Sequence, residues 1–257
     1  MFLPVSKQEL IDRNIEQLDF ILISGDAYID HPSFGIAIIS RMLEAHGYQV
    51  GIIAQPNMKK DGDFTRLGTP RLGFLISSGN IDSMVNHYTV TKRRRTKDQY
   101  SPGGKMGLRP DYAVIKYGVK VRKLYPNTPI IIGGIEASLR RFAHYDYWSN
   151  QVRKSILIDS KADLLIYGMS ELSVVEVADA LDSGLDVKDI IFIEGTMYKT
   201  NKEAYLPHDG VYLPNYDEIL ASNKKYAESF AIKYKNLDHK SAKPLIETYR
   251  YHYGLQN

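Results

Sequence analysis

Short apolar runs alternate along this chain with longer segments in which apolar residues recur every three or four positions. The short runs favour buried strands, and the three-to-four spacing favours amphipathic helices. The predicted strands are Leu18–Ser24, Tyr48–Ala54, Arg71–Ile76, Thr128–Ile132 and Ala162–Tyr167, with a further short strand at Ile190–Ile193. The predicted helices between them are Ser33–His46, Ile81–Tyr88, Asp111–Tyr125 and a helix that runs from an N-cap at Ser170 through Leu181.

This alternation predicts the fold class. A strand, a helix and a second strand form a βαβ unit, whose two strands lie parallel with a right-handed crossover. We therefore expect a doubly wound α/β domain with a mainly parallel sheet of five to six strands and helices on both faces. Ahead of the first strand, Ser6–Asn14 predicts a short helix, with Ser6 and Glu9 at capping-box spacing.

The pattern weakens after Thr196. Tyr205–Pro214 suggests an edge hairpin around Asp209-Gly210, and Asn215–Leu237 has a mainly helical pattern. Asp238–Asn257 is polar and rich in tyrosine, with no obvious core face. We therefore expect a domain over residues 1–196 and an irregular C-terminal appendage over residues 197–257.

Four of the predicted strands end in turns rich in glycine or serine: Ser24-Gly25, Ser77-Ser78-Gly79, Gly133-Gly134 and Gly168. The carboxyl ends of parallel strands share one edge of the sheet, so these turns should converge on one crevice. A single such turn needs glycine only for its tight geometry, but four of them followed by polar residues predict a binding cleft.

The first of these turns opens a polar loop that leads into the predicted helix. Asp26, Asp30 and His31 lie in this loop, and Ser33 and Gly35 stand where the helix begins. Helix N-termini present unpaired N–H groups, so polar or anionic ligands bind there. His31 could be a metal ligand, an acid–base group or a hydrogen-bond donor, although zinc is disfavoured without a second histidine or a cysteine at ligand spacing. The aspartates could bind hydroxyl groups or cap the helix.

Two glutamates follow other strand ends. Glu136 comes after Gly133-Gly134, and Glu171 comes after Gly168. A pair of carboxylates in one crevice could bind ribose hydroxyls or perform acid–base chemistry. One open alternative is therefore a small-molecule hydrolase or transferase that uses Glu136, Glu171 and His31.

The net charge of +3 indicates little about partners, but the basic run Lys92–Arg95 is concentrated within the long irregular segment Thr89–Arg109. Such a run is usually a solvated surface, and it could also bind RNA. The aromatic cluster His144–Trp148 could stack on a flat ligand or cover a core edge. A second alternative is thus an RNA- or protein-binding module.

The chain contains no cysteine, which excludes disulfides, thiolate nucleophiles and Cys-ligated zinc or iron–sulfur clusters within it. The sequence MFLPVSKQELIDRN is too polar for a signal peptide, and no apolar run reaches the length of a membrane span. We expect a cytoplasmic protein with no membrane partner.

Several long blocks resemble the N-terminal region of the YgiQ family of radical SAM proteins, in the right order from about Phe2 to beyond Thr196. These blocks are GDAYIDHPSFG, RMLEAHGYQVGIIAQP, IIIGGIEASLRRFAHYDYWS and SILIDSKADLLIYGMSE. The resemblance implies a Rossmann-like domain similar to the cobalamin-binding domains that precede many radical SAM cores. In those domains a DxHxxG loop follows the first strand, a serine motif the third, and a GG pair the fourth.

The resemblance implies a cofactor-binding cleft but no catalytic residue and no metal ligand in this chain. Asp30 directly precedes His31, and Gly35 comes one residue later than the DxHxxG pattern requires, which argues against an axial histidine on cobalt. The implied cofactor-binding residues are Gly25, Asp26, Asp30, His31, Ser33, Gly35, Ser77, Ser78, Gly79, Gly133, Gly134, Glu136, Gly168 and Glu171.

The family's chemistry implies a partner for this domain. A radical SAM core holds a [4Fe–4S] cluster on a CxxxCxxC loop and binds S-adenosylmethionine at its open iron, and this chain has no cysteine to do so. We therefore expect an accessory domain that is inactive alone and works with a radical SAM core in cis or in trans. The end of the sequence falls where a linker to such a core is expected.

Overall fold

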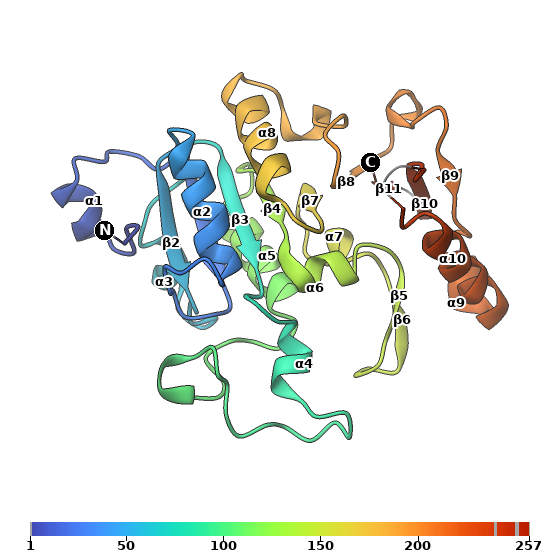
Figure 1. Cartoon of the computed structure of the whole chain (residues 1–257), viewed down its shortest axis with the longest axis horizontal. Helices are drawn as coiled ribbons and strands as arrows, with labels where there is room; N and C mark the ends of the chain where they lie inside the picture. The colour runs from blue at the N-terminus through green and yellow to red at the C-terminus, as the bar shows by residue number, and fades with distance from the viewer. Residues whose placement is uncertain (1, 239–240, 250–251, 257) are drawn as a thin grey trace.

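Nine strands form the main sheet of the computed structural model, which describes residues 2–238, 241–249 and 252–256 (Figure 1). In spatial order they are β2 (Val50–Ala54), β1 (Phe20–Ser24), β3 (Gly73–Ser77), β4 (Ile130–Ile132), β7 (Leu164–Ile166), β8 (Thr196–Thr200), β11 (His252–Gln256), β10 (Leu245–Tyr249) and β9 (Val211–Tyr212). A separate antiparallel hairpin consists of β5 (His144–Asp146) and β6 (Gln151–Arg153).

The helices connect and cover these strands. They are α1 (Lys7–Asp12), α2 (Gly35–Ala45), α3 (Asp61–Thr65), α4 (Ser83–His87), α5 (Ala113–Leu124), α6 (Gly134–Leu139), α7 (Ile156–Asp159), α8 (Glu171–Asp182), α9 (Tyr216–Ala221) and α10 (Asn223–Lys235). Short 3₁₀ turns occur at η1 (Pro102–Gly104), η2 (Val187–Asp189) and η3 (Glu203–Tyr205). At α1 the predicted capping box is present, because Ser6 and Glu9 cap each other's backbone N–H.

The first five strands of the sheet, from β2 to β7, are all parallel, which confirms the predicted α/β class. Their side chains alternate between two cores: Phe20 and Leu22 of β1 pack in one, and Ile21 and Ile23 in the other. Figure 1 shows α2 and α8 on the near face of the sheet, with α5 and α7 behind it. The strand order reverses between β1 and β3, and ligands of open α/β sheets bind at such a switch point.

The C-terminal region is more regular than the sequence pattern indicates. It adds β8 antiparallel to β7 and then β11, β10 and β9, so the main sheet is larger than the predicted five to six strands. Leu245 and Ile246 are buried, which corrects the expectation of a tail without a core face. Asn215–Leu237 is mainly helical as predicted, and the predicted boundary between residues 196 and 197 falls inside β8. Of the predicted tail, residues 239–240, 250–251 and 257 lie outside the described residues.

Two local predictions were wrong. Ile190–Ile193 forms no strand, because the segment is irregular. Its apolar pattern arises because Ile190 and Ile193 are buried in the core. The hairpin predicted over Tyr205–Pro214 is also absent. Its second half contains β9, which pairs in parallel with β10 and not with the segment before Asp209-Gly210.

Candidate functional site

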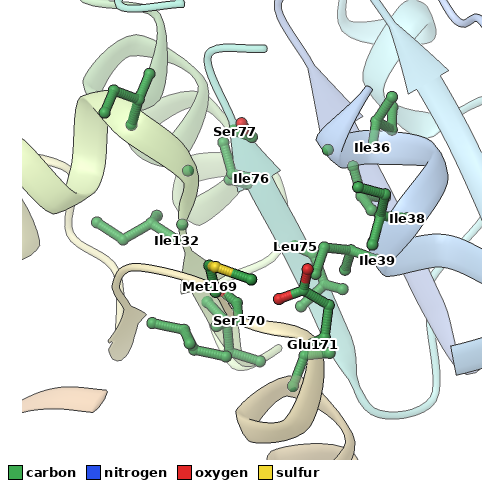
Figure 2. Close-up of a pocket in the computed structure, with 18 of the residues that line it drawn as sticks. Ile36, Ile38, Ile39, Leu75, Ile76, Ser77, Ile132, Met169, Ser170 and Glu171 are labelled. Carbon is green, nitrogen blue, oxygen red and sulfur yellow. The ribbon is translucent and has the colours of Figure 1, made fainter. Parts of the chain in front are cut away.

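A cavity of about 270 Å³ opens at the carboxyl ends of β3, β4 and β7, between α2 and α8 (Figure 2). Its walls are mainly aliphatic side chains, among them Ile39 of α2, Leu75 of β3 and Ile132 of β4. Pockets of this kind bind the apolar part of a small ligand, and a few polar groups orient it. Here the polar side chains are Ser77, Asn80, Ser170 and Glu171.

Seven of the predicted site residues line this cavity, and they come from the starts of two helices and from three of the four predicted turns. They are Gly35, Ser77, Gly79, Gly133, Gly134, Gly168 and Glu171. Their role in binding stays a prediction. The apolar lining side chains were not predicted as site residues, because in the sequence they are indistinguishable from core positions.

The turns require glycine at particular points. Gly134 has a φ of +81°, and a Cβ there would lie 2.6 Å from Ser77 Oγ. Gly79 has a φ of +105°, and its Cβ would lie 2.0 Å from Asp26 Oδ1. Because these residues lack side chains, the turns after β3 and β4 approach each other and the loop after β1.

Asp26 does not line the cavity, because it belongs to a buried ion cluster next to it. Arg109 Nη1 lies 2.8 Å from Asp26 Oδ1 and donates to the Ser78 carbonyl, and Arg109 Nη2 donates to Asp98 at 3.0 Å. Burial raises the pKa of Asp26 to about 6, although Arg109 opposes this shift. Arg109 carried no recognisable signal in the sequence, since it ends an irregular segment.

Gly25 and Ser78 do not line the cavity either, because they form the close contact between the ends of β1 and β3. A Cβ at Gly25 would lie 2.2 Å from the Ser78 carbonyl, so only glycine allows β1 and β3 to end this close together. The buried Ser78 hydroxyl donates to the Ile81 carbonyl at 3.0 Å. The two residues therefore shape the switch point and offer no group to a ligand in the cavity.

Asp30, His31 and Ser33 lie outside the cavity as well. Asp30 accepts a hydrogen bond from Arg41 Nε at 3.1 Å, and this contact lowers the pKa of Asp30. His31 is exposed, and its Nδ1 accepts the Ser33 N–H at 3.1 Å. Asn80 links this loop to the cavity, because its Oδ1 accepts the Gly35 N–H at 3.1 Å.

Glu136 caps two helices. Its Oε2 accepts the Ser83 N–H at 2.8 Å, and its Oε1 accepts the Val114 N–H at 3.0 Å. These N–H groups lie at the starts of α4 and α5, and Glu136 is 1% exposed. Burial raises the pKa of Glu136. Both oxygens therefore have structural partners, and the structure does not bring Glu136 to the cavity with Glu171.

Glu171 is the titratable side chain that lines the cavity in the part of the chain described here. Figure 2 shows its carboxylate pointing between Ile39 and Met169. It is half-buried and has no hydrogen-bond or ion-pair partner among the described residues. Ser170 occupies the N-cap position of α8, but its hydroxyl donates to the Gly168 carbonyl instead of capping the helix. The Glu171 carboxylate thus remains available to a ligand that carries a hydrogen-bond donor.

The basic run lies beside the aromatic cluster. Lys92 Nζ is 4.6 Å from the centroid of the Tyr147 ring, and the Trp148 ring centroid is 5.4 Å from that of Tyr88. These contacts fold the segment onto the protein surface. RNA binding by Lys92–Arg95 stays a prediction.

No group of three or more histidine, aspartate or glutamate side chains in the part of the chain that the structure describes is placed to hold a metal ion. None of the described helices combines the length and the apolar composition that a membrane span requires.

Comparison with known families decides the identity of the domain. A family model described as "Radical SAM N-terminal" matches residues 2–257. The chain belongs to the radical SAM N-terminal family. This confirms the family relationship inferred from the sequence blocks.

Relatives of this radical SAM N-terminal chain are longer proteins. UPF0313 proteins from Clostridium botulinum strain Okra and Clostridium perfringens strain 13 are each 54% identical over 256 residues, which is 100% of this chain. The chain spans 40% of the first and 39% of the second. It therefore corresponds to the N-terminal part of larger radical SAM proteins.

Among solved structures, the chain has a likeness to the radical S-adenosylmethionine methyltransferase TsrM from Kitasatospora setae. The TM-score is 0.46 and the identity 16%, over 72% of this chain and 27% of TsrM in a structure with cobalamin and a [4Fe-4S] cluster bound. A likeness this weak assigns no ligand to the radical SAM N-terminal chain.

Proposed function

We propose that this chain is a ligand-binding accessory domain of a radical SAM protein, and that its ligand occupies the cavity between α2 and α8. The observation that carries the proposal is an apolar cavity at the carboxyl edge of a parallel sheet, next to the strand switch point. Radical SAM catalysis itself belongs to a core in cis or in trans, because a cysteine-free chain cannot hold the cluster that cleaves S-adenosylmethionine.

The lining indicates the class of ligand. Aliphatic side chains on two sides favour a flat, apolar group, and the unpaired Glu171 carboxylate favours a donor N–H or O–H at the rim. At about 270 Å³ the cavity holds a small ring system or one part of a larger cofactor. A ring-bearing cofactor would therefore insert one moiety here and leave the rest outside.

Cobalamin fits this cavity only in part. Its benzimidazole group is flat and apolar, and Ile38, Ile39 and the glycine turns would hold it. The described residues that line the cavity include no histidine, and His31 is exposed outside it. A histidine ligand to cobalt would therefore have to come from outside the cavity, where most of a bound cobalamin would lie.

The test is to mix the purified chain with hydroxocobalamin, desalt it, and measure retained absorbance. Benzimidazole and S-adenosylmethionine are titrated separately by calorimetry. Ile38→Trp, which fills the cavity, should abolish any binding, whereas Val119→Trp places the same ring on the exposed side of α5 and should preserve it. If none of these ligands binds the wild-type chain, or if both variants bind equally, the cavity is not a site for this ligand class.

A further inference from the structure

A second cleft of about 440 Å³ lies between α10 and the segment that leads from α6 into the β5–β6 hairpin. One wall is a stripe on α10. Tyr226, Phe230 and Tyr234 recur every four residues, so they lie along one side of the helix, and Leu237 extends this wall two residues after the helix ends. Phe230, Tyr234 and Leu237 are 60%, 67% and 63% exposed. A helix of a free-standing protein rarely exposes such a stripe.

The opposite wall is also apolar and exposed. It consists of Leu139 at the end of α6, Val85 of α4, and Tyr145 and Tyr147 of the hairpin region. Tyrosine and phenylalanine are enriched in protein interfaces, where their rings fill pockets at little entropic cost. Both walls therefore have the composition of a protein-binding surface.

Charged side chains at the floor of the cleft already have partners within the protein. Arg140 forms an ion pair with Asp82, and Lys233 Nζ donates to the Ala143 carbonyl at 3.3 Å. Burial lowers the pKa of Lys233 and lowers that of His144 to about 4. The ion pair neutralises Arg140, and the exposed aromatic and aliphatic side chains of the two walls favour an apolar occupant.

The two walls are fixed to each other. The Tyr145 N–H donates to the Tyr226 hydroxyl at 3.2 Å, and the Ala143 N–H donates to Glu247 of β10 at 2.9 Å. The cleft is therefore held open by hydrogen bonds between α10, the hairpin and the sheet, and it needs little reorganisation to accept a partner.

We propose that this cleft is the docking surface for the remaining, core-bearing part of the longer radical SAM proteins, which lays an apolar segment between α10 and the hairpin. More than half of each relative's length lies outside the matched region, so a large intramolecular partner is available. This inference rests on the proposed accessory role, but it does not depend on what the α2–α8 cavity binds.

The test compares amide hydrogen exchange in the isolated chain with that in a protein where this chain is joined to the unmatched remainder of the Clostridium botulinum relative. Docking predicts that amides of α10 and of residues 144–153 exchange at least about tenfold more slowly in the joined protein, with α1 unchanged. Phe230→Glu with Tyr234→Glu should remove this protection. Leu220→Glu, on the exposed side of α9 outside the cleft, should not.

Unchanged exchange in the cleft, or protection only elsewhere, overturns the proposal. If the joined protein does not assemble, the same comparison between the intact relative and its own matched region decides in the same way. Two further outcomes also overturn it: a dimer of the isolated chain that Phe230→Glu disperses, or cleft protection by RNA that is lost at high salt. Ligand binding by the isolated chain is measured separately, so failure of the α2–α8 site is distinguishable from failure of docking.

Discussion

Arg109 Nη1 lies 2.8 Å from Asp26 Oδ1, and neither side chain is measurably open to solvent. The same guanidinium binds Asp98 and the Ser78 carbonyl, so it ties together the ends of β1 and β3 and the irregular segment that follows α4. A buried arginine between two carboxylates holds the switch point of the sheet in one arrangement. The stability of this region should therefore depend on the ion cluster.

Arg109→Met should strongly destabilise the protein. It leaves Asp26 and Asp98 buried without their cation, and removing one partner of a buried pair costs about 3–5 kcal/mol. The free energy of unfolding by urea denaturation measures the effect. Arg93→Met, in the exposed basic run, is the matched control and should change stability by no more than about 0.5 kcal/mol. Equal effects of the two variants would contradict the structural role of Arg109.

Asp26 should stabilise the folded protein more at low pH than at neutral pH, which is the reverse of the usual behaviour of a carboxylate. Its folded-state pKa of about 6 lies above the value of about 3.9 for an unfolded chain, so the folded protein binds this proton more tightly. The contribution is full below about pH 4 and is lost as the pH rises through 6. From pH 4 to 7, the wild type should lose on the order of 2–3 kcal/mol of unfolding free energy relative to Asp26→Asn. A difference that stays constant with pH would contradict this.

Gly79→Ala should destabilise the protein more than Gly68→Ala. Both glycines have positive φ, +105° and +82°, so both variants carry the left-handed strain of about 1–2 kcal/mol. A Cβ at residue 79 also lies 2.0 Å from Asp26 Oδ1, whereas one at residue 68 meets no atom within 4 Å. The added overlap should cost about 1–3 kcal/mol more in thermal or chemical denaturation. Equal losses would mean that the loops after β1 and β3 are not in contact.

Glu136 and Glu171 should have separable roles. Glu136→Ala leaves the buried N–H groups of Ser83 and Val114 without an acceptor, at about 1–3 kcal/mol each. Glu171→Ala should change the unfolding free energy by about 0.5 kcal/mol or less and act on ligand binding instead. Denaturation and calorimetry on the same two variants check both statements. A turnover that requires both carboxylates would revive the hydrolase or transferase alternative.

Much of the fold could be predicted because its signals are local. Apolar runs marked β1 to β4 and β7, and Ser6 with Glu9 marked the cap of α1. The last strands escaped prediction because β10 and β11, although they pair with each other, join the sheet only through β9 and β8, which are distant in sequence. Edge and C-terminal strands gain their stability from those partners and carry a weak pattern of their own.

The sequence alone determined the parallel α/β sheet, the glycine turns at its carboxyl edge and the family, because periodicity, turn chemistry and long matching blocks are properties of the chain itself. Only the tertiary structure decided which polar residues line the cavity. Asp26 and Glu136 looked like site residues, but Arg109 and two helix N-termini occupy them, while Glu171 is left free at the cavity. A carboxylate's role depends on the partners that folding brings within hydrogen-bond distance, and those partners lie up to dozens of residues away in the sequence.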